Sequence, residues 1–243
     1  AYGLAAADGV MSGLAAQQRG FRIGSVRVPL VPQAILFDLL NGGDKPWARG
    51  EDVEPPYRAL GRAALEAAAL DFALGNAGAG YGATTQNLKG GLGSASARAA
   101  TGQIVGALVA VNAVGTATVG DGPHFWAAPY ERDGEFGARG WPAAFTPDLL
   151  GLRLKGGTGQ NTTIALVATD AVLTKAQAKR LALAAHDGLA RALRPAHGAL
   201  DGDIVFAAAT GHSGAPSDAH ALTELCATAA DVLARAVARG VHA

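Results

Sequence analysis

Cysteine is almost absent from this chain, because Cys226 is the single cysteine among 243 residues. One thiol excludes an internal disulfide framework and a cysteine-rich zinc site. Cys226 falls on the apolar face of a predicted helix, so we expect a buried thiol with a packing role.

The chain also lacks an excess of charge of either sign. Twenty basic residues balance twenty acidic residues, and the basic residues form no run. Because nucleic acids and anionic membranes bind concentrated positive charge, neither is an expected partner. Small molecules and further copies of the chain are the expected partners.

Long apolar runs are missing as well. No run approaches the roughly 20 residues that a membrane-spanning helix needs. The chain opens at Ala1 directly in helix-like sequence, without a basic and apolar leader. We therefore expect no secretory segment and a cytoplasmic location, although a stretch removed upstream would leave no trace.

Several well-known hydrolase signatures are absent. The sequence contains neither a G-x-S-x-G turn nor an H-E-x-x-H helix, and its six histidines are scattered. The single cysteine has no surroundings typical of catalysis. We assign no role to a histidine, and we expect neither a cofactor nor a metal ion.

What the sequence does contain is enough apolar surface for a large core, since 49% of its residues are hydrophobic. We expect one domain over residues 1–243, or two closely merged ones. Periodicity predicts a buried helix over 2–19, helices over 57–74, 174–194 and 217–240, and strands over 34–39, 103–111, from 162 onward, and over 204–209. The two strands and two helices after residue 162 look like half of a layered sandwich.

A glycine-rich segment spans residues 75–96. It suggests a phosphate-binding loop, but the spacing is not G-x-G-x-x-G, no Walker sequence occurs, and the segment follows a predicted helix instead of a strand. Lys89, one of only five lysines, lies among these glycines. A loop lysine is usually solvated, yet one in a glycine-lined pocket could stabilise an oxyanion.

Residues 119–160 form a long irregular region that is rich in glycine, proline and aromatic residues. Such a stretch is uncommon within a compact domain and is either functional or loosely held. It leads directly to Asn161 and Thr162, where a mobile tail would suit a cleavage site. Its aromatic residues could equally form an oligomer contact.

The segment Asn161-Thr162-Thr163-Ile164 changes within one step from small polar residues to an apolar run. A self-cleaving N-terminal-nucleophile enzyme needs a hydroxyl residue at this place, because cleavage gives that residue a free α-amine. An amine of reference pKa about 7.7 to 8.0 can take the proton of the threonine hydroxyl at neutral pH. The alternative is a polar entrance to an ordinary strand.

Two further patterns could carry chemistry. Asp201 and Asp203 lie two apart, so on an extended backbone both carboxylates project to one face and raise the pKa of one member. They could instead form an acidic turn or bind a divalent cation, although no third carboxylate is near and no EF-hand pattern surrounds them. Asn112 ends the predicted strand over 103–111, where it could be a site residue or only a turn former.

Together these residues resemble the DmpA-type family. The resemblance rests on Lys89-Gly90-Gly91, Asn112, Asn161-Thr162-Thr163-Ile164 and Asp201-Gly202-Asp203. That family contains L-aminopeptidase/D-amidase/esterases, β-peptidyl aminopeptidases and nylon-oligomer (6-aminohexanoate-oligomer) hydrolases, with ornithine acetyltransferase as a more distant relative. The Asn-Thr-Thr-Ile and Asp-Gly-Asp segments are most similar to the nylon-oligomer branch, because the aminopeptidase branch usually has Gly before a Ser nucleophile.

The resemblance implies an α+β protein with a four-layer αββα sandwich. It implies autocleavage between Asn161 and Thr162 into an α chain 1–161 and a β chain 162–243, with assembly into tetramers of αβ units. The expected activity is hydrolysis of an amide in short peptides or amino-acid oligomers, with the acyl group carried on the nucleophile. An acyltransferase with the same nucleophile and a non-catalytic binding or assembly protein are the alternatives.

The resemblance also implies residue roles. Thr162 would be the nucleophile, Asp201 and Asp203 would orient and tune it, and Lys89 and Asn112 would bind the substrate or its oxyanion. The expected substrate-binding residues are Phe37 and Tyr81. Two features depart from the family: Phe37 stands where relatives commonly have a tyrosine, and the family has strands before the helix with which this chain begins. The second departure fits either a piece of a longer protein or a sheet completed in another way.

Overall fold

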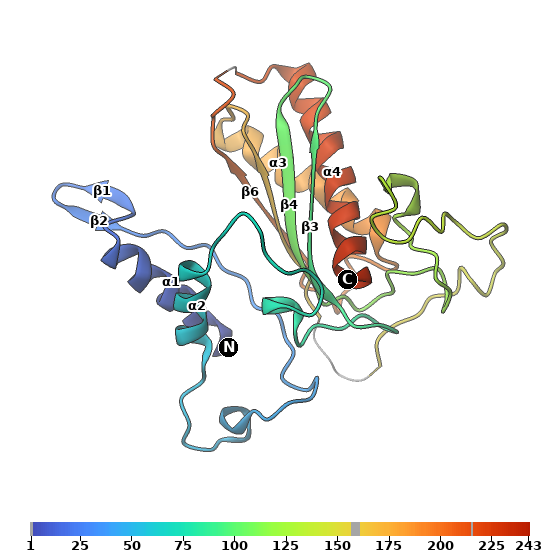
Figure 1. Ribbon diagram of the computed structural model, residues 1–243, viewed down its shortest axis with the longest axis horizontal. Helices are drawn as coiled ribbons and strands as arrows, with labels where there is room; N and C mark the ends of the chain where they lie inside the picture. Colours follow the sequence, from blue (N-terminus) through green and yellow to red (C-terminus); the bar gives the residue numbers. More distant parts are fainter. Residues whose placement is uncertain (1, 157–160, 215) are drawn as a thin grey trace. The chain divides into compact units, whose positions relative to one another are not determined.

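The computed structural model describes residues 2–156, 161–214 and 216–243 (Figure 1). The chain forms two compact units. Unit 1 consists of Ala1–Ile35 and Gly42–Phe72, and unit 2 consists of Leu36–Asn41 and Ala73–Ala243.

Unit 1 is built on two helices that pack closely, α1 (Ala5–Ala16) and α2 (Tyr57–Glu66). A side chain on Gly9 would collide with the backbone of Arg58, and one on Gly61 would collide with the backbone of Ala6. Glycine at both positions therefore permits the close approach. The unit also contains the hairpin of β1 (Phe21–Ile23) and β2 (Val26–Val28), and the short helices η1 (Tyr2–Leu4) and η2 (Pro46–Arg49).

Both helices predicted for the first third of the chain are present, but the burial of the first, the length of the second and the strand over 34–39 were predicted wrongly. The first helix is not buried, because only its glycines Gly9 and Gly13 are buried. The predicted helix over 57–74 ends at Glu66, and its expected apolar residues Leu60 and Phe72 are 57% and 48% exposed. Residues 34–39 form no strand. The described residues leave these apolar positions half-buried or exposed instead of buried.

Unit 2 is built on a four-stranded sheet of order β3-β4-β5-β6. Its strands are β3 (Gly91–Arg98), β4 (Ile104–Val111), β5 (Ile164–Thr169) and β6 (Ile204–Ala209). The first two pairings are antiparallel, and β5 pairs with β6 in parallel. The parallel pair is connected through a helix, as parallel strands require.

Helices α3 (Lys175–Ala192) and α4 (Ala219–His242) pack against this sheet (Figure 1). The prediction of a helix capped by Thr174 is confirmed, since Thr174 and Gln177 form a capping box. The core lies between the helices and one face of the sheet, where it includes Val105, Val109, Val167, Leu181, Leu189, Leu225 and Leu233. Cys226 is half-buried against this core, and burial raises the pKa of its thiol.

The predicted α+β class is confirmed by these elements. The described residues of unit 2 supply one sheet and one helical layer of the expected αββα sandwich. On the opposite side of the sheet, Leu108 and Leu166 are direct partners in register, and each is 38% exposed.

The glycine-rich segment contains strand β3 and the short helix η3 (Gly78–Gly80), where the sequence suggested only a loop. Side chains on Gly91 and Gly93 would collide with the backbone of α4 at Gly240 and Ala236. These glycines therefore let a helix lie directly on the strand. This packing gives them a structural reason that is independent of any phosphate ligand.

The described part of the irregular region, residues 119–156, contains only the short helix η4 (Ala128–Tyr130) and is nevertheless well anchored. Phe125 and Phe136 are buried in the core. Glu135 forms a buried ion pair with Arg235 of α4 at 2.5 Å. These contacts hold the first part of the region, whereas most residues of 140–156 are exposed. The mobile tail stays a prediction, and its last residues, 157–160, lie outside the described part of the chain.

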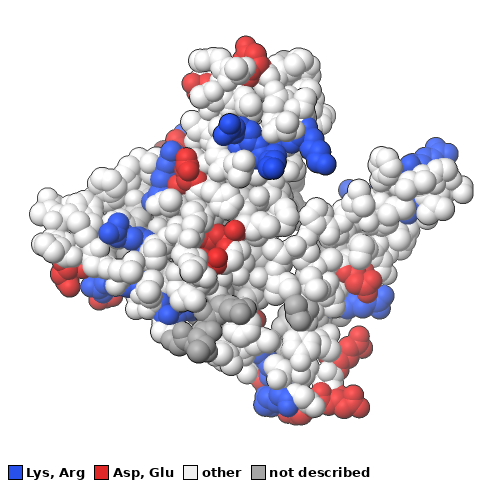
Figure 2. Space-filling model, turned by 180° about the vertical axis from the view of Figure 1, so that it is seen from behind, with Lys and Arg blue, Asp and Glu red and all other residues white. Residues whose placement is uncertain are grey.

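On the face shown in Figure 2, the charged side chains form small separate groups of both signs. No helix among the residues that the structure describes is long and apolar enough to cross a membrane.

Candidate active site

The peptide between Asn161 and Thr162 is held by an extension of the β5–β6 pairing. Ile164 is opposite Ile204 in the parallel ladder, and Asn161 lies opposite Asp201 in the same register. As a result, the backbone N–H of Gly202 donates to the carbonyl oxygen of Asn161 at 2.8 Å. A backbone donor fixed in this way is suited to stabilise negative charge on that oxygen.

The hydroxyl of Thr162 lies directly beside this peptide. Its Oγ1 is 2.7 Å from the carbonyl oxygen of Asn161, and it donates a hydrogen bond to that oxygen. The backbone N–H of Thr162 donates to the carbonyl oxygen of Asn112 at 2.9 Å. The nucleophile predicted from the sequence is thus next to the bond that it is predicted to cleave, and its nitrogen has a fixed acceptor.

Asn112 follows the last residue of β4 and is fully buried. Its Nδ2 donates to the carbonyl oxygen of Phe37 at 3.0 Å, and its Oδ1 accepts from the backbone N–H of Thr84 at 3.1 Å. Such a buried amide is held in one orientation by its partners. Phe37 therefore contributes its backbone carbonyl to the site. Its side chain is half-buried, and its role in substrate binding stays a prediction.

Asp201 and Asp203 flank Gly202 at the start of β6 and are held by different partners. Asp201 Oδ1 accepts from the backbone N–H of Val114 at 3.0 Å, whereas the buried Oδ2 has no hydrogen-bond partner among the described residues. Burial, with a further contribution from the negative charge of Asp203, raises the pKa of Asp201 to about 6. A carboxyl group with this pKa can exchange protons near neutral pH.

Asp203 is connected to the residue after the nucleophile. Its Oδ1 accepts from the backbone N–H of Thr163 at 3.0 Å, and its side chain is only 2% exposed. Its Oδ2 lies 3.1 Å from Nδ1 of His197 and also accepts from the backbone N–H of that residue at 3.1 Å. Asp203 thereby couples the start of β5 to the loop after α3.

His197 was not found from the sequence. The ring of His197 lies 4.9 Å from that of His186, and burial lowers the pKa of His186. The one available signal was the short distance in sequence between His197 and the Asp201-Gly202-Asp203 segment, which does not by itself predict a contact.

Lys155 is the second residue that the sequence did not indicate. Its Nζ donates to the carbonyl oxygen of Thr84 at 3.0 Å, to Asn112 Oδ1 at 3.2 Å and to Asn161 Oδ1 at 2.9 Å. Burial lowers the pKa of Lys155, and the negative charge of Asp201 opposes this shift. The lysine that joins Asn112 to Asn161 is therefore Lys155.

Lys89 makes a separate set of contacts. Its Nζ donates to Asn76 Oδ1 at 2.9 Å and to the carbonyl oxygen of Tyr81 at 3.1 Å, and it lies 5.5 Å from the centre of the Tyr81 ring. The Tyr81 side chain is 69% exposed. The structure brings Lys89 and Tyr81 together, but it shows no contact of either with Thr162, so their site roles remain predictions.

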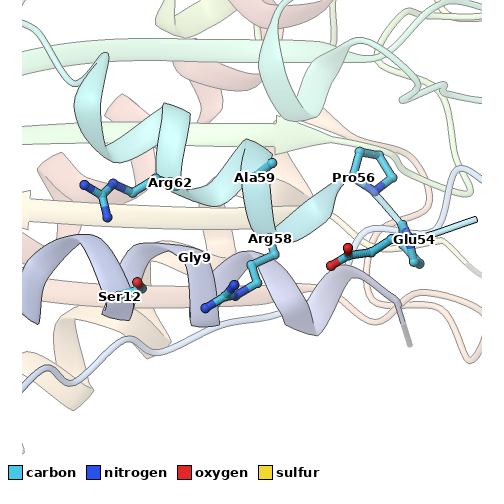
Figure 3. Close-up of a pocket in the computed structure, with 8 residues that line it drawn as sticks. Gly9, Ser12, Glu54, Pro56, Arg58, Ala59 and Arg62 are labelled. Atoms are coloured by element: carbon cyan, nitrogen blue, oxygen red, sulfur yellow. The ribbon is translucent and has the colours of Figure 1, made fainter.

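Two cavities in the described structure lie away from these residues. One cavity of about 460 Å³ lies within unit 1 beside α1 and α2, and Figure 3 shows Arg58 and Arg62 at its edge. A second, of about 650 Å³, is bordered by Trp126, Trp141 and Arg194 in unit 2. None of the predicted site residues lines either cavity. No group of three potential metal ligands is found among the residues that the structure describes.

Comparison with known proteins identifies the family of this chain. The family model described as Peptidase family S58 matches residues 1–243. An uncharacterized aminopeptidase of Mycobacterium tuberculosis is 44% identical over 99% of this chain and 71% of its own length. A 6-aminohexanoate-oligomer endohydrolase of Kocuria sp. is 31% identical over 86% of this chain and 58% of its own length.

Two solved structures are also similar. A beta-aminopeptidase of Burkholderia sp. superposes with a TM-score of 0.61 at 25% identity, over 97% of this chain and 64% of that chain. The L-aminopeptidase D-Ala-esterase/amidase of Ochrobactrum anthropi, described as a variant of the Ntn hydrolase fold, gives a TM-score of 0.52 at 28% identity, over 76% of this chain and 49% of that chain. The chain thus spans about half to two thirds of the length of these solved proteins.

These findings confirm the resemblance predicted from the sequence, including its nylon-oligomer hydrolase relatives. They also confirm the expected fold type, because the similar L-aminopeptidase D-Ala-esterase/amidase is described as a variant of the Ntn hydrolase fold. The chain belongs to peptidase family S58.

Proposed function

We propose that this chain is a self-cleaving amide hydrolase with Thr162 as its N-terminal nucleophile, acting on short peptides or amino-acid oligomers. One observation carries the proposal: Thr162 Oγ1 is 2.7 Å from the carbonyl oxygen of Asn161, and that oxygen also accepts the backbone N–H of Gly202. The relatives named as aminopeptidases and as 6-aminohexanoate-oligomer endohydrolases support the same reaction class.

Self-cleavage would begin with attack of Thr162 Oγ1 on the carbonyl carbon of Asn161. The C–N bond between the two residues breaks, an ester forms to Thr162, and the hydroxyl proton moves to the departing nitrogen. Water then hydrolyses the ester. The products are an α chain 1–161 that ends in a carboxylate and a β chain 162–243 that begins with the free amine of Thr162.

The new amine would then serve as the base in substrate hydrolysis. It takes the proton of Thr162 Oγ1 while that oxygen attacks the substrate amide, and it returns a proton to the leaving amine. The carbonyl oxygen of Asn112, which accepts the N–H of Thr162 at 2.9 Å, would hold the amine in place. Asp201 and Asp203 would set its orientation and the local charge, and Asn112 and Lys89 would bind substrate.

The experiment is a hydrolysis assay with a panel of p-nitroanilides of L-α-amino acids and β-amino acids, together with a linear oligomer of 6-aminohexanoate. The wild-type protein is expected to hydrolyse at least one of them, and Thr162→Ala to hydrolyse none. Rapid acid quenching and mass spectrometry should find the acyl group on the fragment that begins at Thr162. Acylation on any other fragment, or equal activity of Thr162→Ala, would contradict the proposal.

Assembly is a further part of the proposal, since the resemblance implies a homo-tetramer of αβ units. Light scattering coupled to size-exclusion chromatography measures the mass of the assembled protein directly. A mass of about one chain at all concentrations would contradict the tetramer and leave the assignment of the nucleophile unaffected.

A further inference from the structure

Lys155 has an unusual environment for a lysine. The side chain is half-buried, and its Nζ donates to three oxygen atoms, at 3.0 Å on Thr84, 3.2 Å on Asn112 and 2.9 Å on Asn161. An ammonium group has three hydrogen atoms, so these three acceptors match its full donor capacity. The group is therefore fixed in place instead of extending into solvent.

All three acceptors are uncharged. Among the described residues, Lys155 forms no ion pair within 4.0 Å. Burial lowers the pKa of its amine, and the negative charge of Asp201 opposes this shift. Partly burying a cation without a directly paired carboxylate costs free energy. A titratable group whose pKa is perturbed in this way is a candidate for a functional site.

Two of the three acceptors belong to residues at the cleavage site. Asn161 Oδ1 is on the side chain of the residue whose carbonyl is attacked, and Asn112 Oδ1 is on the amide whose backbone oxygen holds the N–H of Thr162. The carbonyl oxygen of Asn161 is fixed by Gly202, and its side chain is fixed by Lys155. These two contacts restrain the Asn161 carbonyl group beside the hydroxyl of Thr162.

We propose that Lys155 is a positioning residue for self-cleavage, and that it selects residue 161 by the oxygen of its side chain. This inference rests on the proposed function, because it concerns the same reaction. Lys155 makes no covalent bond in the reaction: the oxygen of Thr162 bonds to the carbonyl carbon of Asn161, the C–N bond breaks, and the proton moves to the leaving nitrogen. Lys155 fixes the attacked group through Asn161 Oδ1.

The test is the rate of cleavage of the full chain after cell-free synthesis, followed by intact-mass spectrometry of samples taken over time. Lys155→Met is expected to slow cleavage about 10-fold to 100-fold, the range for a lost hydrogen bond to a charged group. Lys155→Arg keeps a cationic donor and should recover most of the rate. Lys179→Met, which changes an exposed lysine on α3, is the matched control and should cleave within about twofold of wild type.

A double-mutant cycle separates positioning from a general effect on the fold. Asn161→Ala should slow cleavage to a similar degree, and adding Lys155→Met to it should slow cleavage by less than about threefold more. Each variant is also combined with Thr162→Ala, and its thermal melting is compared with that of Thr162→Ala alone, so that a loss of folding is recognised.

Two results would overturn the inference. One is cleavage of Lys155→Met at the wild-type rate. The other is an equal slowing by Lys155→Met with and without the Asn161 side chain, which would mean that the lysine acts through the fold and not through Asn161. Both are distinct from failure of the proposed function, in which the wild-type chain itself would remain uncut.

Discussion

Replacing Gly202 with alanine would place a methyl group against the predicted nucleophile. A Cβ atom on residue 202 would lie 3.0 Å from Thr162 Oγ1 and 3.6 Å from the carbonyl oxygen of Asn161. A contact of 3.0 Å is tighter than nine in ten real Cβ contacts, so the neighbouring group must move by a few tenths of an ångström. That group is the hydroxyl that is proposed to attack the carbonyl carbon of Asn161.

The effect on self-cleavage follows from this displacement. A misplacement of about 1 Å costs roughly 100-fold in rate, so a shift of a few tenths of an ångström should slow cleavage about 3-fold to 30-fold. The backbone of residue 202 does not have the positive φ that favours glycine. The free energy of unfolding should therefore change by less than about 1 kcal/mol.

The assay is intact-mass spectrometry of the newly made chain over time, with Gly106→Ala as the control. Gly106 lies in β4, where the nearest atom to an added Cβ is the carbonyl oxygen of Ala95 at 3.9 Å. Gly106→Ala should cleave at the wild-type rate. If Gly202→Ala also cleaves within twofold of wild type, the position of Thr162 Oγ1 seen here is not the position from which it attacks.

Three further predictions follow from the carboxylates, the amide and the histidine of the site. Asp201 has a folded-state pKa of about 6, above its reference value of 3.8, so the folded chain binds more protons than the unfolded chain between these pH values. The free energy of unfolding of Thr162→Ala should thus fall as the pH rises from 4 to 7. The full change in the pKa of Asp201 corresponds to about 3 kcal/mol, and because the side chain is partly exposed we expect a fall of about 1 to 2 kcal/mol. Denaturant unfolding measures this fall, and an Asp201→Asn version that keeps the same slope would contradict the assignment. Asn112→Ala removes a buried group with fixed partners, so it should lower kcat about 10²-fold to 10³-fold and the free energy of unfolding by about 1 to 3 kcal/mol. A variant that keeps its activity and only unfolds more easily would show that Asn112 has a structural role alone. His197→Ala removes a partner of Asp203 and should slow cleavage about 10-fold, as measured by the same mass time course, whereas an unchanged rate would show that the backbone donors to Asp203 suffice.

The parts of the site that the sequence predicted are those attached to buried strands. Apolar runs placed β4, β5 and β6 close to their true positions, and strand ends therefore located Asn112, Thr162 and the Asp201-Gly202-Asp203 segment. Because β5 and β6 pair in parallel and in register, residues just before each strand lie side by side. The apolar pattern along the chain and the pairing of the strands together account for the positions of Asn112, Thr162 and the Asp201-Gly202-Asp203 segment.

The parts that were missed depend on contacts between residues far apart in the chain. Strand β3 was read as a loop because its glycines have meaning only when α4, more than 120 residues later, packs on them. Lys155 was missed because its three acceptors come from separate segments around residues 84, 112 and 161. The helix predicted over 57–74 was expected to be buried along its apolar residues, but Leu60 and Phe72 are exposed. An apolar pattern predicts a face that can be buried and does not show whether other parts of the chain cover it.

The measurement that tests the central claim most directly is intact-mass spectrometry of the denatured, purified protein, with Thr162→Ala measured alongside. The account predicts two fragments that meet between Asn161 and Thr162, the second beginning with a free threonine amine, and one uncut chain in the variant. A wild-type chain that stays uncut under conditions in which it is folded, or cuts at a different bond, would contradict the claim that Thr162 is a self-processing nucleophile.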